Sequence, residues 1–445
     1  MLNNLIAPVL RPFIKNEEDL NRLATVIIPT FIVRSGYFII SFLIAIVLTR
    51  SLGPSRYGVF SLTGTIIFSL MNFSSYGFEV IALRFTSSYL SKGEKGLWKG
   101  MYNWSSKLLI IISTAVAAGA VLFIWVFVYL FHILPKTDYT LPVLVTCSVI
   151  PIYALMNFYA NLLRGQGKSL VSFLPDNIVK PLFLLVMLVI LRLTIKHLSL
   201  HIAIGLNIVS FGVAFVFIFL LFRRVNNLNQ VQAIYDKPKW RRFVTSLFIL
   251  TLVSSLSNKL DSILLGAIKD SAQVGIYSAA DKYASSLLFF MYVMNMIIAP
   301  SLASLNTPEN KDKLQKMITR TIRWVMLFTL PVFIGIIIFS GQIMHISGSQ
   351  FEPGQTALII IGCGILIDIA FGPVGNFALM TGNEKYNTIY MAISILINIA
   401  LNLMLTPRMG FVGTAIATAS CTIFWNAAMF ITIMRKTGIR TWIFG

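Results

Sequence analysis

The stretch Leu52-Gly53-Pro54-Ser55-Arg56-Tyr57 separates two long apolar runs, residues 23–48 and 58–82. Each run is longer than the ~20 residues that a helix needs to cross the hydrocarbon core of a bilayer. Glycine and proline in the short polar segment disfavour a straight helix and favour a turn. The pattern therefore predicts a hairpin of two membrane-spanning helices.

The composition of the whole chain agrees with this hairpin. Of its 445 residues, 57% are hydrophobic and only 12% are charged, whereas soluble domains carry about 25% charged residues. These values exclude a soluble enzyme, a disordered protein and a disulfide scaffold. We therefore expect an all-α polytopic membrane protein.

Further apolar runs of span length continue along the chain, and we expect twelve transmembrane helices, each of ~20 residues or more. The twelve candidate spans are residues 23–48, 58–82, 106–132, 141–163, 172–194, 200–222, 243–268, 274–301, 322–343, 354–379, 387–407 and 411–434.

The charged residues predict the orientation of these spans. The formal net charge is +20, and with both termini in the cytoplasm 25 of the 36 Lys and Arg residues fall on the cytoplasmic side. Seven fall on the other side and four lie inside spans. Basic residues collect in cytoplasmic loops, where they meet anionic headgroups. We therefore expect the lipid bilayer, and no nucleic acid, as the partner of this basic surface.

Two pairs of matched segments indicate an internal duplication. Gly58-Val59-Phe60-Ser61 corresponds to Gly275-Ile276-Tyr277-Ser278, and Arg164-Gly165-Gln166-Gly167-Lys168 corresponds to Thr381-Gly382-Asn383-Glu384-Lys385. Gly58 and Gly275, like Gly165 and Gly382, are 217 residues apart. The shared offset predicts two parallel six-helix repeats related by an axis along the membrane normal. We expect lobes at 1–222 and 243–445, joined by a basic cytoplasmic linker at 223–242.

Several segments of the chain resemble those of a known family. Residues 45–60, 261–266 and 274–280 look like the first-hairpin signatures of bacterial polysaccharide (O-antigen-type) flippases, and residues 410–418 resemble the start of the last helix in that family. The resemblance covers nearly the whole chain. It implies the multidrug/oligosaccharidyl-lipid/polysaccharide exporter superfamily, with a V-shaped pair of six-helix lobes.

The resemblance also implies a function. It implies that the substrate is an undecaprenyl-pyrophosphate-linked oligosaccharide, turned over from the cytoplasmic to the outer leaflet for cell-surface polysaccharide synthesis. The location that follows is the bacterial cytoplasmic (inner) membrane, and we expect the chain to work as a monomer by alternating access.

Ionisable residues inside spans are costly and are therefore candidates for function. The candidates for substrate binding are the bases Arg34, Lys180, Lys259 and Lys282. The candidates for ion coupling or gating are the acids Glu79, Asp176, Asp261, Asp281 and Asp368.

Several of these residues have structural alternatives. Asp176 and Lys180 are four residues apart and could neutralise each other on one helix face. Asp261 with Lys282, or Lys259 with Asp281, lie at matching depths on neighbouring helices. Arg34 and Asp368 have no opposite charge on their own helix. We therefore expect Arg34 to face the space between the lobes and to bind the pyrophosphate of the substrate, since a guanidinium suits phosphate oxygens.

Two other functions compete with the flippase. A cation-coupled multidrug antiporter of the same superfamily would favour an acidic cavity, whereas these buried bases and acids nearly balance. A membrane glycosyltransferase or polymerase would need a large external loop, and the longest outer loop expected here is about ten residues. We expect no enzyme activity and no cofactor, only a coupling ion such as Na⁺ or H⁺.

Overall fold

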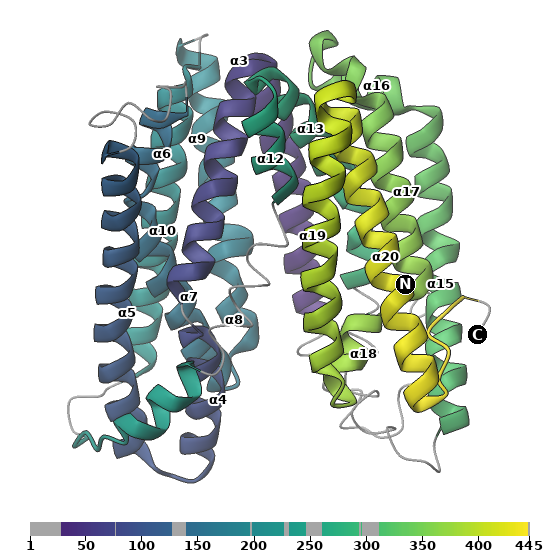
Figure 1. The fold of residues 1–445 in the computed structure, drawn as a ribbon. Helices are drawn as coiled ribbons and strands as arrows, with labels where there is room; N and C mark the ends of the chain where they lie inside the picture. The colour runs from purple at the N-terminus through teal and green to yellow at the C-terminus, as the bar shows by residue number, and fades with distance from the viewer. Residues whose placement is uncertain are drawn as a thin grey trace.

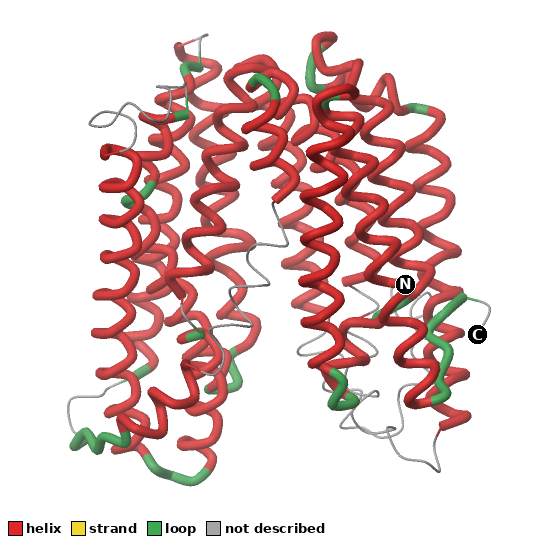
Figure 2. Tube along the Cα trace, in the orientation of Figure 1, coloured by secondary structure: helices red, strands yellow, loops and turns green. Residues whose placement is uncertain are grey.

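The computed structural model describes residues 28–75, 77–126, 139–195, 198–226, 231–245, 260–292, 295 and 311–443. Within these ranges the chain is almost wholly helical and has no β-strand (Figure 2). Apolar segments in lipid adopt helices because each helix satisfies its own backbone hydrogen bonds.

The helices follow one another with short connections. In the N-terminal half they are α3 (Ile28–Ser75), α4 (Phe78–Ser91), α5 (Lys95–Ile124), α6 (Thr140–Thr146), α7 (Val149–Gly165), α8 (Ser169–Leu174), the π-helix η4 (Pro175–Val179), α9 (Lys180–Ile195) and α10 (Leu200–Val225). In the C-terminal half they are α12 (Leu260–Ile268), α13 (Ser271–Ala284), the 3₁₀ turn η5 (Ser285–Leu287), α15 (Lys311–Ile338), α16 (Ser340–Ile346), the 3₁₀ turn η7 (Ser349–Gly354), α17 (Gln355–Phe371), α18 (Val374–Met380), α19 (Glu384–Met409) and α20 (Phe411–Thr437).

The described part of the chain contains eight helices that are long and apolar enough to cross a membrane. The bent pair α6 and α7, inclined at 41°, raises this number to nine. The protein is therefore an all-helical, multi-pass membrane protein. The helix α3 is counted as one span, although its residues 28–75 include most of the first two spans expected from the sequence, 23–48 and 58–82.

The expected turn of the first hairpin lies inside α3. Gly53 has a φ of 71°, in the left-handed region that glycine adopts readily. Pro54 follows, and its fixed φ suits the first turn of a new helical segment. The two arms of α3 meet at the top of Figure 1.

The helices form two groups that lie side by side (Figure 1). Helices α4 to α10 make the N-terminal group, helices α15 to α20 make the C-terminal group, and α3, α12 and α13 lie between them. The arms of α3 pack against α13 and α12. The two groups meet where the arms of α3 join and diverge toward the end that carries α4 and α18 (Figure 1).

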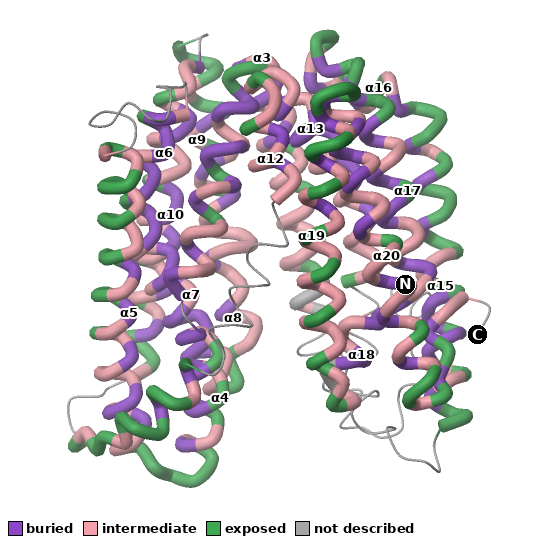
Figure 3. The backbone as a smooth tube through the Cα atoms, in the orientation of Figure 1, coloured by how far each residue is buried: buried purple, intermediate pink, exposed green. Residues whose placement is uncertain are grey.

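Burial follows the contacts between helices (Figure 3). Phe78, Phe158 and Phe222 are almost fully buried within the N-terminal group, as are Phe377 and Met429 within the C-terminal group. The outward faces carry large exposed apolar residues, for example Leu193, Leu396 and Met404. This distribution suits a protein whose outer surface contacts lipid.

The expected linker packs against the N-terminal group. Residues 237–245 are helical, and Trp240 is fully buried with its Nε1 donating to Tyr89 Oη at 2.8 Å. The backbone N of Ile234 donates to Gly96 O at 2.9 Å. Residues 227–230 and 246–259 lie outside the described ranges.

Candidate functional site

A cavity of about 320 Å³ lies where the two helix groups meet. Both arms of α3 and the helices α12 and α13 contribute to its wall. Its polar lining is rich in hydroxyl groups and includes one acid and one base: Ser41, Tyr57, Ser61, Thr65, Ser262, Ser278, Asp281 and Lys282. The sequence did not single out the hydroxyl groups, because serine and threonine are common in transmembrane helices.

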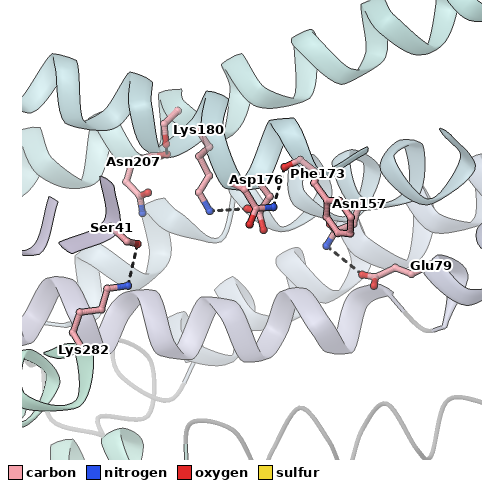
Figure 4. Close-up of polar contacts among 10 residues, drawn as sticks. Ser41, Glu79, Asn157, Phe173, Asp176, Lys180, Asn207 and Lys282 are labelled. Atoms are coloured by element: carbon pink, nitrogen blue, oxygen red, sulfur yellow. Dashed lines mark hydrogen bonds and ion pairs between the residues drawn. The ribbon is translucent and has the colours of Figure 1, made fainter. Parts of the chain in front are cut away.

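Lys282 connects α13 to α3 across this cavity. Its Nζ donates to Ser41 Oγ at 3.0 Å (Figure 4). The same Nζ lies 5.9 Å from the ring centroid of Tyr37. The expected pair of Asp261 with Lys282 is wrong, since each of the two side chains bonds to a different polar neighbour. The alternative pair of Lys259 with Asp281 involves Lys259, which lies outside the described residues.

Arg34 lies on the same arm of α3 as Ser41, seven positions earlier. Two turns of an α-helix span ~7.2 residues, so the two side chains share one face. The Arg34 guanidinium carbon lies 5.2 Å from the ring centroid of Phe173 on α8 and 5.5 Å from that of Tyr292. Because Phe173 belongs to the N-terminal half and Tyr292 follows η5, Arg34 lies between the two halves of the chain.

A second arginine contacts the same phenyl ring. The guanidinium carbon of Arg164, at the end of α7, lies 4.4 Å from the ring centroid of Phe173. Arg164 also donates to Ser172 Oγ and to Asn161 Oδ1, both at 3.3 Å. The sequence analysis named Arg164 only as part of a repeated segment and did not include it among the candidate site residues.

The expected neutralisation of Lys180 by Asp176 is confirmed. Lys180 Nζ lies 3.0 Å from Asp176 Oδ1 (Figure 4). It also lies 4.2 Å from the ring centroid of Phe211. Asp176 lies in the π-helix η4, where an extra residue per turn shifts the register of the helix. Such π segments are often found at functional sites. The acid makes Lys180 a weaker candidate for binding an anion.

Glu79 faces α7 in the N-terminal group. Asn157 Nδ2 donates to Glu79 Oε1 at 3.3 Å (Figure 4). Arg84, five positions after Glu79 in the chain, lies with its guanidinium carbon 5.1 Å from the ring centroid of Phe243. Glu79 is thus held by an amide rather than by Arg84.

Asp261 belongs to a separate polar cluster in the C-terminal half. Asn398 Nδ2 donates to Asp261 Oδ1 at 2.6 Å, and Asn402 Nδ2 donates to the same atom at 3.5 Å. Thr406 Oγ1 donates to Asn402 Oδ1 at 2.9 Å, and Thr414 lies 3.0 Å from Thr406 Oγ1. This cluster connects α12, α19 and α20.

Asp368 is held in the same half of the chain. Asn426 Nδ2 on α20 donates to Asp368 Oδ1 at 2.7 Å. The partner is an uncharged amide 58 residues away in sequence, which a search for charged neighbours on the same helix does not find. The two C-terminal acids Asp261 and Asp368 therefore have asparagine partners, whereas Asp176 has a lysine.

A comparison with models of known protein families identifies the family to which the chain belongs. The model of the polysaccharide biosynthesis protein family matches residues 25–306, which is more than half of the chain. The chain belongs to the polysaccharide biosynthesis protein family. A second model, MatE, matches residues 247–404. The family consists of transporters and not of enzymes, so the glycosyltransferase alternative is excluded.

Two curated archaeal proteins are similar to this family member. The probable low-salt glycan biosynthesis flippase Agl15 of Haloferax volcanii is 26% identical over 200 residues, covering 43% of this chain and 42% of the relative. The probable flippase AglR of the same organism is 23% identical over 175 residues, covering 36% of this chain and 34% of the relative. The matches thus span less than half of either relative.

Solved structures share the fold of this family member. An inward-facing multidrug resistance MATE family transporter of the MOP superfamily has a TM-score of 0.72, with 14% identity, over 92% of this chain and 98% of that one. The lipid II flippase MurJ in its inward closed conformation has a TM-score of 0.68, with 15% identity, over 91% of this chain and 86% of that one. An outward-facing MATE transporter reaches 0.63, with 14% identity, over 93% of this chain and 94% of that one.

Proposed function

We propose that this protein flips a lipid-linked oligosaccharide, carried on undecaprenyl pyrophosphate, from the cytoplasmic to the outer leaflet by alternating access. The observation that carries the proposal is the position of Arg34 between Phe173 and Tyr292. Within the described part of the chain Arg34 has no ion pair. A charge without a counter-ion at membrane depth is costly unless it meets water or an anionic ligand.

The proposed architecture has twelve spans, with lobes at 1–222 and 243–445 joined at 223–242. The close approach of the repeat-equivalent residues Gly58 and Gly275 supports the two parallel lobes. The basic turn between α4 and α5 and the basic ends of α10 and α15 support a cytoplasmic position for the end at which the groups diverge. We place both termini in the cytoplasm of a bacterial inner membrane and take the monomer as the working unit.

We further propose that Asp261 couples transport to Na⁺ or H⁺. Its carboxylate accepts hydrogen bonds from Asn398 and Asn402 of α19, and the hydroxyl groups of Thr406 on α19 and Thr414 on α20 extend this polar cluster. Oxygen ligands of this kind suit hard cations, and a carboxylate suits a proton. Asp368, with its Asn426 partner, is a second candidate.

A reconstituted assay tests the main proposal. Proteoliposomes would hold a fluorescent undecaprenyl-pyrophosphate oligosaccharide, and a membrane-impermeant enzyme would cleave the exposed sugar. Protein should increase the fraction cleaved. A fluorescent organic cation tests the multidrug antiporter, which the likeness to MATE structures favours. Export of the cation without movement of the glycan would contradict the flippase.

A further inference from the structure

We infer that α4 and the helical part of the linker, residues 237–245, together bind the phosphate headgroup of an anionic phospholipid of the cytoplasmic leaflet. These nine residues are called the linker helix below. The inference goes beyond the proposed function, because it concerns a second ligand at a site separate from Arg34 and Lys282. The ligand is a resident lipid of the membrane, such as phosphatidylglycerol, rather than the transported one.

The site is a groove of about 690 Å³ between the linker helix and α4. The linker helix, drawn in teal at the lower left of Figure 1, lies beside the ends of α4 and α5. Arg84 of α4 lines the groove together with Lys239 and Arg242 of the linker helix. The two elements are far apart in the chain, so only the tertiary structure brings these three bases together. Among the described residues that line the groove there is no acid.

Packing holds the linker helix beside the groove. Trp240 is fully buried and donates to Tyr89 Oη at 2.8 Å, and its ring centroid lies 5.7 Å from that of Trp104. The ring centroids of Phe85 and Phe243, which form the floor of the groove, lie 5.2 Å apart. The groove therefore exists before a ligand binds. A preorganised site loses less conformational freedom on binding.

The bases of the groove contact aromatic rings and not carboxylates. The guanidinium carbon of Arg84 lies 5.1 Å from the ring centroid of Phe243, and Lys239 Nζ lies 5.7 Å from that of Phe85. Within the described part of the chain, Arg84, Lys239 and Arg242 form no ion pair. A cation beside an aromatic face still has N–H donors for an oxyanion. A phosphate would also relieve the repulsion among the three like charges.

A second cavity, of about 800 Å³, adjoins the first along the linker helix. Pro238 and Arg242 line both cavities, whereas Lys237 and Arg241 line only the second. The acid nearest in the chain, Asp236, precedes the helix and lines neither cavity. The linker helix therefore presents bases on both flanks. Clusters of basic residues on the cytoplasmic side of a membrane protein are typical of sites for anionic headgroups.

The apolar surface next to the bases favours a lipid over a soluble phosphate. Val80 is exposed and lies one helical turn before Arg84, on the same face of α4. Ile110 and Ile111 are exposed about two turns after Trp104, which lines the second cavity. Acyl chains can lie along these residues while the phosphate contacts the bases. Bases and tryptophan beside an exposed apolar face are typical of the membrane interface.

The test measures lipid binding to the purified full-length protein in detergent. The protein is titrated with dioleoyl phosphatidylglycerol or with dioleoyl phosphatidylcholine, and native mass spectrometry measures the dissociation constant of the first bound lipid. We expect the wild type to bind the anionic lipid more tightly than the zwitterionic one. Arg84→Ala and Arg242→Ala should each weaken phosphatidylglycerol binding about fivefold, as expected for the loss of one interfacial base.

Arg224→Ala is the matched control. Arg224 is an exposed arginine at the end of α10 and lines neither cavity, so this variant should bind phosphatidylglycerol as the wild type does. The double variant of Arg84 and Arg242 distinguishes one shared phosphate from two independent attractions. If both side chains contact the same phosphate, the double variant loses less affinity than the product of the two single losses. A loss equal to that product would contradict a shared site.

Soluble competitors distinguish a lipid from a free phosphate. Neither inorganic phosphate nor glycerol 3-phosphate should displace phosphatidylglycerol, because neither contacts the apolar surface. Displacement by either compound would assign the site to a soluble phosphate and overturn the inference. If Arg242→Ala elutes as aggregate in size-exclusion chromatography, Lys239→Gln, at an exposed position, decides the matter with an expected loss of about fivefold.

Three further results would overturn the inference. They are equal affinity of the wild type for the two lipids, unchanged phosphatidylglycerol binding in the Arg84 and Arg242 variants, and an equal loss in Arg224→Ala, which would indicate a diffuse attraction of the basic surface. None of these measurements involves glycan flipping, so the proposed function is tested separately.

Discussion

Gly58 and Gly275 meet backbone to backbone where the two helix groups join. A Cβ atom on Gly58 would lie 1.7 Å from Ser271 O, and one on Gly275 would lie 2.0 Å from Pro54 O. Neither position has room for a methyl group. The two glycines are also the equivalent positions of the proposed repeat, so the same residue type allows close approach from both sides.

Gly58→Ala and Gly275→Ala should each open this junction, because overpacking costs about 1–3 kcal/mol and the clash here is with backbone. The pair Ser55→Cys and Ser271→Cys reports the change, since the two hydroxyl oxygens lie 2.8 Å apart. We expect efficient disulfide formation between these cysteines in the parent protein and much less in either alanine variant.

Gly212→Ala is the control for this measurement, because a Cβ there meets nothing within 4 Å. It should leave crosslinking unchanged. Full crosslinking in Gly58→Ala would mean that the junction adjusts without opening.

Replacing Arg34 should abolish transport without unfolding the protein. Arg34→Ala removes the proposed contact with the pyrophosphate, whereas Arg34→Lys keeps a charge but loses the bidentate geometry and should recover transport only partly. The flipping assay measures the rate, and membrane protein level and thermal stability serve as controls. Normal transport by Arg34→Ala would exclude Arg34 from the substrate site.

Replacing Asp261 should separate coupling from substrate binding. Asp261→Asn keeps the shape of the side chain but removes its charge, so flipping should no longer respond to an imposed Na⁺ or H⁺ gradient. Binding of geranyl diphosphate should stay unchanged, since Asp261 contacts Asn398 and not the Arg34 region. Asp312→Asn, an exposed acid of α15, is the matched control. If flipping by Asp261→Asn responds to the gradient as flipping by the wild type does, a residue other than Asp261 couples transport to the ion.

Trp240→Ala should release the linker from the N-terminal group. The indole is fully buried and bonded to Tyr89, and Trp-to-Ala changes in a packed core cost ~3–5 kcal/mol. We expect a lower melting temperature and faster proteolysis of residues 231–245. Trp324→Ala, at an exposed site on α15, should change neither. Equal effects in both variants would show that Trp240 is not a specific anchor.

The proposed topology predicts the outcome of reporter fusions. Fusions after Lys136 and after Lys269 should report the outer side, and a fusion after Lys237 should report the cytoplasm. The expectation follows from the excess of basic residues on one side. A cytoplasmic signal at Lys136 would reverse the first half of the topology.

Local patterns were sufficient to predict much of the fold. Apolar run length predicts membrane helices because the bilayer sets their length, and Gly53-Pro54 predicts a break because of its backbone restrictions. The spacing of Asp176 and Lys180 predicts their ion pair, since residues four apart share a helix face. Each of these predictions depends only on residues close together in the chain.

The amino-acid sequence by itself determined the all-helical membrane class, the first hairpin and the short list of costly intramembrane charges. Tertiary structure alone decided what those charges contact. Asp261 lies against Asn398 rather than Lys282, Asp368 lies against Asn426, and Arg164 joins Arg34 at Phe173. The reason is physical: helix depth can be read from span length, but rotation about each helix axis and the packing between helices depend on all the neighbours at once.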